Sequence, residues 1–280
     1  LYVDPALAAT VETDEPEALL AAAAGAPGPR ELLMRIGARR PTVERSLDPD
    51  GRRALAGPAD VANAERWLLR SLIKQNEGFM SRHFERRISL AITRRLAPTR
   101  VTPNAMTLVS LAVGLAGALC FVSPTAAWQL TGALLFLAHS ILDGCDGELA
   151  RLRFQESRWG AILDFWGDNL VHLAFFMGVA VGWSREAVAA WPLAIGAVAG
   201  LAGLGSATLL AERTMRDEAP GAGAAWTARL QAALANRDFI YAVVALSAFG
   251  KAKWFLAMAA IGAPVFLLLS LFTVRTSRGG

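Results

Sequence analysis

Long stretches without charged side chains dominate the second half of the chain. Residues 101–142 carry no Asp, Glu, Lys or Arg over 42 positions, and residues 187–211 carry none over 25. A helix needs about 20 apolar residues to cross a bilayer. The first stretch is therefore long enough for two crossings and the second for one, which predicts an integral membrane protein built from helices.

Six transmembrane helices follow from these stretches and their breaks. The Ser123-Pro124 pair interrupts the first stretch, because proline cannot continue a helix in its interior. The expected spans cover roughly residues 104–122, 126–151, 159–183, 187–213, 236–250 and 254–274. The predicted fold class is all-α, and the even number of spans places both chain ends on the same side of the membrane.

Two amphipathic segments precede the first span. In the segment "AERWLLRSLIK", one helical face carries Trp67, Leu68, Leu72 and Ile73. In "FMSRHFERRISLAITRRLAP", a stripe opposite five arginines carries Phe84, Ile88 and Ile92. The second segment has the composition of a helix lying in the membrane interface. The first fits equally well a solvated charged face packed on the cytoplasmic loops.

The pattern divides the chain into three parts. Residues 1–60 are punctuated by Ala, Gly and Pro and predict a linker or the remnant of an N-terminal cytoplasmic domain. Residues 61–100 hold the amphipathic helices, and residues 101–280 hold the six-helix membrane domain. Cys120 and Cys145 are expected near opposite ends of the first two spans, so we predict no disulfide. Gly196 and Gly200 fit packing inside the bundle better than a dimer contact.

Charge predicts the orientation in the membrane. The chain is 54% hydrophobic and has 28 basic against 24 acidic side chains, too apolar for an ordinary soluble domain and too charged to lie wholly in a membrane. The positive-inside rule places the side with most arginines in the cytoplasm. Both termini and the aspartate-rich turn are therefore expected to face the cytoplasm from the cytoplasmic membrane. Lipid is the expected surrounding, and no nucleic-acid partner is expected.

Four aspartates interrupt this apolar sequence in two pairs. Asp143 and Asp146 are three residues apart, and Asp164 and Asp168 are four apart, so each pair shares one helical face. Four converging carboxylates would repel one another and take up protons unless a cation neutralised them. Oxygen ligands suit Mg²⁺ or Mn²⁺, and four carboxylates can balance two such ions, an arrangement that clamps a phosphoryl group.

The residues between the two pairs fit a phosphate ligand. Gly147, Ala150 and Gly160 are small enough to let a bulky ligand approach the helix backbone, and Arg151 supplies a cation one turn after Gly147. Taken singly, each has another explanation. A membrane aspartate can be a proton relay, an arginine can anchor a helix end, and glycines often serve helix packing.

Together these positions resemble the signature of the CDP-alcohol phosphotransferase family. The string is Asp143-x-x-Asp146-Gly147-x-x-Ala150-Arg151, eight residues, then Gly160-x-x-x-Asp164-x-x-x-Asp168. The resemblance covers roughly residues 76–275. It implies a six-helix membrane enzyme, usually a homodimer, which moves a phosphoryl-linked alcohol from a CDP-alcohol donor to the hydroxyl of an alcohol acceptor and releases CMP.

The resemblance also implies roles for individual residues. Asp143, Asp146, Asp164 and Asp168 match the ligands of two divalent cations, and Asp168 matches the base that deprotonates the acceptor. The residues that match the nucleotide pocket are Gly147, Ala150, Arg151 and Gly160. Asn104 and Thr107 resemble further nucleotide contacts, although Pro103-Asn104 can equally just start a helix. No Ser, Cys or His in the motif has a base at suitable spacing, so we expect a single displacement.

A polar, phosphorylated acceptor needs further cations. The arginines expected on the cytoplasmic face are Arg94, Arg95, Arg153, Arg158, Arg213 and Arg237. Arg237 lies nearest the expected bundle interior, and pairing with Asp238 is its alternative role. Residues 68–107 also resemble the segment joining the halves of bifunctional inositol-phosphate cytidylyltransferase and di-myo-inositol-phosphate phosphate synthases. No second activity is assigned to residues 1–60, which have no nucleotide-binding glycine loop.

Three functions follow as hypotheses. The first is synthesis of an inositol-phosphate diester. The second is a phospholipid headgroup synthase that uses CDP-diacylglycerol with glycerol phosphate, inositol phosphate or serine. The third is a divalent-cation or proton-coupled transporter, which has no need of Gly147, Ala150 and Gly160 at these spacings. The sequence does not choose the donor and acceptor, Mg²⁺ or Mn²⁺, or the oligomeric state.

Overall fold

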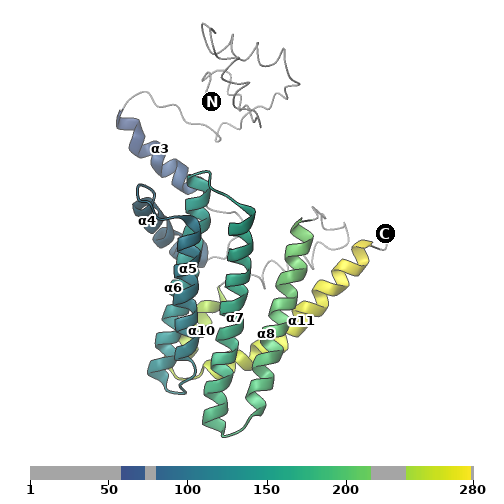
Figure 1. Ribbon diagram of the computed structural model, residues 1–280. Helices are drawn as coiled ribbons and strands as arrows, with labels where there is room; N and C mark the ends of the chain where they lie inside the picture. Colours follow the sequence, from purple (N-terminus) through teal and green to yellow (C-terminus); the bar gives the residue numbers. More distant parts are fainter. Residues whose placement is uncertain (1–57, 73–79, 216–237, 279–280) are drawn as a thin grey trace. The chain divides into compact units, whose positions relative to one another are not determined.

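The computed structural model describes residues 58–72, 80–215 and 238–278, and every regular element in these ranges is a helix (Figure 1). The chain divides into two compact units, residues 1–68 and residues 69–280, and the second carries all the helices discussed below except most of α3. The helices are α3 (Pro58–Ser71), a π-helical turn η2 (Ser81–Glu85), α4 (Arg86–Leu96), α5 (Pro103–Cys120), α6 (Ala126–Leu152), α7 (Arg158–Ala187), α8 (Trp191–Met215), α10 (Phe239–Ala248) and α11 (Ala252–Arg278).

A helix lies at each of the six expected spans, but only four helices in the described residues are long and apolar enough to cross a membrane: α5, α7, α8 and α11. This supports an integral membrane protein. Helix α6 has 27 residues, but its second half carries the acidic residues of the motif. Helix α10 has only 10 residues and is about 15 Å long, half the thickness of the hydrocarbon core. Six crossings therefore remain a prediction.

Side-chain hydrogen bonds cap the N-termini of α5 and α7. The Thr102 hydroxyl accepts a hydrogen bond from the Ala105 N–H at 3.2 Å, and Pro103 occupies the first helical position of α5. The Ser157 hydroxyl accepts from the Gly160 N–H at 3.0 Å at the start of α7. Local sequence therefore determines where both helices start.

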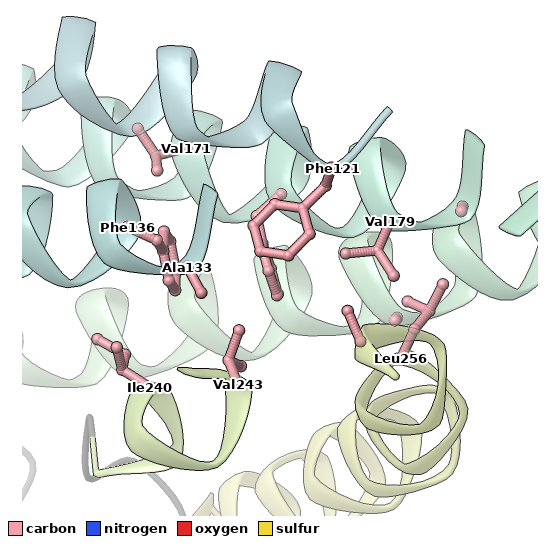
Figure 2. Packing of buried hydrophobic residues seen from close by; sticks show 12 residues of the cluster. Phe121, Ala133, Phe136, Val171, Val179, Ile240, Val243 and Leu256 are labelled. Carbon is pink, nitrogen blue, oxygen red and sulfur yellow. The ribbon is translucent and has the colours of Figure 1, made fainter. Parts of the chain in front are cut away.

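Aromatic rings hold α6 and α7 together in the core. Phe136 of α6 stacks on Phe175 of α7, with ring centroids 4.7 Å apart and an interplanar angle of 10°. Phe121, at the end of α5, meets the Phe175 ring edge-on at 5.0 Å. Figure 2 shows this cluster continuing to Ile240 and Val243 of α10. The short helix α10 thus closes the core on the side of α6.

Glycines bring the backbones of α5 and α7 into direct contact. A Cβ placed at Gly178 would collide with the Ala118 carbonyl oxygen, and one at Gly182 would collide with that of Phe121. Cβ atoms at Gly196 and Gly200 of α8 would meet side chains of α7 at 2.5 Å. The prediction that this glycine pair packs inside the bundle is therefore confirmed. Both cysteines are free.

Helix α4 buries a polar face that the sequence analysis did not foresee. The expected apolar stripe includes Phe84 and Ile88, and these side chains are 50% and 36% exposed. The buried residues are instead the polar Ser89 and Thr93 of α4, together with Glu85 at the end of η2. Helix α4 packs against α6. Ile92, the third residue of the expected stripe, is half-buried and packs against the cluster of Met106, Cys145 and Leu149. A location of α4 in the membrane interface remains a prediction.

We expect Gly178→Ala to destabilise the protein and Gly203→Ala to leave its stability unchanged or slightly raised, because alanine favours the helix more than glycine does. The added methyl group at Gly178 must push apart two backbones, at a cost of about 1–3 kcal/mol, whereas a Cβ at Gly203 meets nothing within 4 Å. Thermal unfolding in detergent, followed by tryptophan fluorescence, measures the difference. Equal melting temperatures for the two variants would contradict backbone contact between α5 and α7.

Candidate active site

Three aspartates from two helices converge. Asp143 of α6 and Asp164 and Asp168 of α7 each offer a carboxylate oxygen, and these atoms all lie within 4.8 Å of one another. Asp143 is buried, and the other two are partly buried. Such a group of carboxylates repels itself strongly in a low-dielectric site. A divalent cation with oxygen ligands is the chemical species that these three residues fit.

Helix α5 supports both carboxylate-bearing helices. It packs against α6 and against α7, so all three helices hold the site. On α7, Asp164 and Asp168 are four residues apart and share one face. The glycine contacts between α5 and α7 fix how closely these helices approach. The site therefore depends on the packing of the helical trio α5, α6 and α7.

Asp146 has a different environment from the other three aspartates. It is buried, its carboxylate accepts a short hydrogen bond from the Thr107 hydroxyl of α5, and it also accepts from the N–H of Gly147. The structure therefore brings three of the four predicted ligands together, and the fourth, on the same helix as Asp143, is bonded to α5. The Thr107 hydroxyl oxygen also lies 3.3 Å from the Pro103 carbonyl oxygen. The first turn of α5 is thus tied to the motif.

A histidine that the sequence analysis missed contacts the cluster. His139 Nδ1 lies 2.9 Å from the Ser110 carbonyl oxygen, which can only accept, so Nδ1 carries the hydrogen. Nε2 then faces an oxygen of Asp168 at 3.5 Å. His139 is 3% exposed. A histidine within a charge-free stretch was the one available signal, because its partners are distant in sequence.

The side chain of Arg151 lies over Gly147. A Cβ at Gly147 would lie 3.2 Å from a terminal guanidinium nitrogen of Arg151, so glycine leaves the arginine its place. The Arg151 Nε is buried, and no described group accepts a hydrogen bond from it. A buried donor without an acceptor is costly. An anionic ligand over Gly147 would supply that acceptor.

The beginnings of α5 and α7 meet beside this arginine-bearing end of α6. The Asn104 Oδ1 lies 3.2 Å from the position that a Cβ of Gly160 would occupy. Asn104 is exposed, and Gly160 and Ala150 are partly buried. Helix N-termini present unpaired N–H groups and a positive dipole end, both of which suit an anion. All six predicted nucleotide residues thus lie on these three helix ends.

The structure describes the side chains of only two of the four predicted acceptor arginines. Arg94 and Arg158 are exposed. Arg213 lies within α8, but its side chain is outside the described residues, as is all of Arg237. Arg153, one of the arginines expected on the cytoplasmic face, contacts backbone carbonyls. Its guanidinium donates to the carbonyls of Leu96, Ala97, Thr99 and Val101.

Comparison with known proteins agrees with the motif. Residues 100–277, well over half of the chain, match the family described as CDP-alcohol phosphatidyltransferase. The chain is 37% identical over 132 residues to a "Bifunctional IPC transferase and DIPP synthase" of Thermococcus kodakarensis, covering 47% of this chain and 29% of that protein. A protein of the same name from Archaeoglobus fulgidus is 37% identical over 142 residues, covering 50% of this chain and 28% of that protein. The match spans less than a third of these relatives' length.

A solved structure shares the fold. The phosphatidylinositol phosphate synthase of Mycobacterium tuberculosis, crystallised with CDP-DAG bound, superimposes with a TM-score of 0.56 at 20% sequence identity. The superposition covers 69% of this chain and 96% of that one. At this identity the likeness shows the fold alone.

We expect Asp164→Asn to weaken Mn²⁺ binding by about tenfold or more, because a neutral amide replaces one of three converging carboxylates. Electron paramagnetic resonance titration of the detergent-purified protein measures free Mn²⁺ directly. Glu186→Gln is the matched control. Glu186 lies on the same helix but pairs with Lys253 at 2.5 Å, on a different helix. Equal losses in both variants would show that binding is not at the aspartate cluster.

Proposed function

Because the chain belongs to the CDP-alcohol phosphatidyltransferase family, we propose that it transfers a phospho-alcohol group from a CDP-alcohol to the hydroxyl of a polar acceptor, with release of CMP. The observation that carries this proposal is the convergence of Asp143, Asp164 and Asp168, which lie on helices whose neighbouring ends are the N-terminus of α7 and the Arg151-bearing end of α6. A carboxylate cluster supports cation-assisted phosphoryl chemistry. The neighbouring Arg151 supports binding of a phosphate.

Divalent cations are the proposed cofactors. Asp143, Asp164 and Asp168 would hold Mg²⁺ or Mn²⁺, and Asp146 would join them as a ligand of a second ion. When bound, the ions neutralise phosphate charge and lower the pKa of an acceptor hydroxyl. Thr107 holds the Asp146 carboxylate in place through its hydroxyl.

The proposed reaction is a single displacement at the phosphorus that carries the alcohol. A P–O bond forms to the acceptor oxygen, the P–O bond to CMP breaks, and Asp168 takes the proton of the acceptor hydroxyl. A protonated His139, donating from Nε2, would orient the Asp168 carboxylate from the buried side. Arg151 binds phosphate above Gly147, and Asn104, Ala150 and Gly160 line the nucleotide site.

The proposed acceptor is an inositol phosphate. The support is the identity with proteins named as DIPP synthases, together with a cytoplasmic face rich in arginine. Arg94, Arg158, Arg213 and Arg237 are the proposed acceptor contacts. We further propose a homodimer of six-span subunits in the cytoplasmic membrane, with both termini and the active site facing the cytoplasm.

CMP release tests the function. Purified protein in detergent is given CDP-inositol or CDP-diacylglycerol, each with inositol phosphate, glycerol phosphate, serine or inositol, in Mg²⁺ or in EDTA. We expect release from CDP-inositol with inositol phosphate in Mg²⁺ only. Release from CDP-diacylglycerol would instead identify a phospholipid headgroup synthase. No release from any pair, by protein that does not bind CDP, would refute the proposal and favour a transporter.

We expect Asp168→Asn to abolish turnover while CDP binding stays measurable. The amide cannot take the acceptor's proton, so the loss of kcat should exceed about 100-fold. Isothermal titration with CDP in Mg²⁺ gives the binding readout. If CDP affinity falls as steeply as kcat, Asp168 serves mainly as a ligand and not as the base.

A further inference from the structure

We propose that Arg153 is a positioning residue for the nucleotide site, which acts by holding the backbone that leads into α5. The proposal rests on the proposed function, since it assigns Asn104 and Thr107 to donor binding. Arg153 is one of the arginines expected on the cytoplasmic face. Its contacts show a different task.

The guanidinium of Arg153 gathers four carbonyl oxygens from one short segment. Nη2 lies 2.7 Å from the Leu96 oxygen, 3.0 Å from that of Ala97 and 2.6 Å from that of Thr99. Nη1 lies 2.5 Å from the Val101 oxygen. The planar fork of arginine can reach several acceptors at once, which a lysine ammonium on a single nitrogen cannot match.

The cation stabilises these carbonyls in two ways. Those of Leu96 and Ala97 lie at the end of α4, where they carry the negative end of its dipole, and the Leu96 oxygen also accepts from the Thr99 N–H at 2.9 Å and the Thr99 hydroxyl at 2.7 Å. Those of Thr99 and Val101 lie in the connection to α5, where no regular structure would otherwise bond them. Arg153 therefore fixes the whole path from α4 to the start of α5.

The fixed path ends at nucleotide-site residues. Thr102 caps α5 one residue after Val101, Asn104 reaches Gly160 of α7, and the Thr107 hydroxyl donates to Asp146. Arg153 itself caps the end of α6, the helix that carries Asp146. Its side chain thus ties the end of α6 to the start of α5 next to the place where both contribute to the site.

A strained turn supports the same arrangement. Phe154 has φ 54°, a left-handed conformation rare for a bulky side chain. Its N–H donates to the Arg151 carbonyl at 3.3 Å, and the Gln155 N–H donates to that of Ala150 at 2.8 Å, which ends α6 in a Schellman motif. Arg151 and Arg153 both lie at this helix end, but their side chains have different partners. Arg153 donates to backbone carbonyls, whereas no described group accepts from the Nε of Arg151.

The test measures CDP affinity, donor KM and kcat for the full chain with Arg153→Met and Arg153→Lys. We expect both variants to raise the CDP Kd and the donor KM by about tenfold, with kcat changed by less than about threefold, because the cluster of aspartates stays intact. Arg185→Met is the matched control. Arg185 donates to the Val122 carbonyl near the opposite end of α5, at 3.3 Å, and its loss should leave the CDP Kd unchanged.

A double-mutant cycle with Asn104→Ala separates positioning from direct contact. If Arg153 acts through α5, Asn104→Ala should weaken CDP binding by about tenfold in the wild type and by less than about threefold in Arg153→Met. Additive losses, or full affinity in Arg153→Lys, would show that Arg153 attracts the phosphate by charge and would overturn the proposal. Failure of the wild type to release CMP would refute the proposed function instead, whereas the CDP affinities still test Arg153.

Discussion

A fully buried carboxylate, that of Glu148, determines how helix α6 faces its neighbours. Glu148 is 0% exposed, and its carboxylate accepts from Arg86 at 2.6 Å, Ser89 at 2.7 Å and Thr93 at 2.7 Å, all from α4. Breaking such a pair on one side leaves a buried charge, which costs about 3–5 kcal/mol. Glu148 must therefore face α4, and because Asp146 lies two residues earlier, the helical period turns it to the opposite side. The ion pair thus directs Asp146 toward α5.

The acidic and basic groups of the site lie at different positions along the helices. The carboxylates that would hold cations lie within α6 and α7, whereas Arg151 and Arg153 lie at the end of α6. One arginine has an unsatisfied Nε and the other is fully engaged with backbone carbonyls. A donor with a diphosphate would then find its positive contacts at the helix ends and its reacting phosphorus near the cluster.

Much of this arrangement was visible in the sequence, and the limits have physical causes. Charge-free runs and the spacing of the aspartates predicted the helices and the grouping of Asp143, Asp164 and Asp168. Helical periodicity showed an apolar stripe on α4 but not that its polar face is buried, because the partner Glu148 lies more than fifty residues away. The contacts of His139 and Arg153 also join residues far apart in the sequence, 29 residues for His139 and Ser110 and 52 for Arg153 and Val101. No local pattern distinguishes an arginine that binds a ligand from one that holds backbone carbonyls.

The backbone contact between α5 and α7 has a consequence for the evolution of the sequence. Gly178 and Gly182 lie against carbonyl oxygens, so at these two positions the spacing between the helices is set by backbone atoms and not by side chains. Exposed apolar residues elsewhere, such as Leu201 of α8 and Ile261 of α11, are free of this constraint. Residues on the outer surface can therefore be substituted to suit bilayers of different thickness and lipid composition without changing these backbone contacts between α5 and α7.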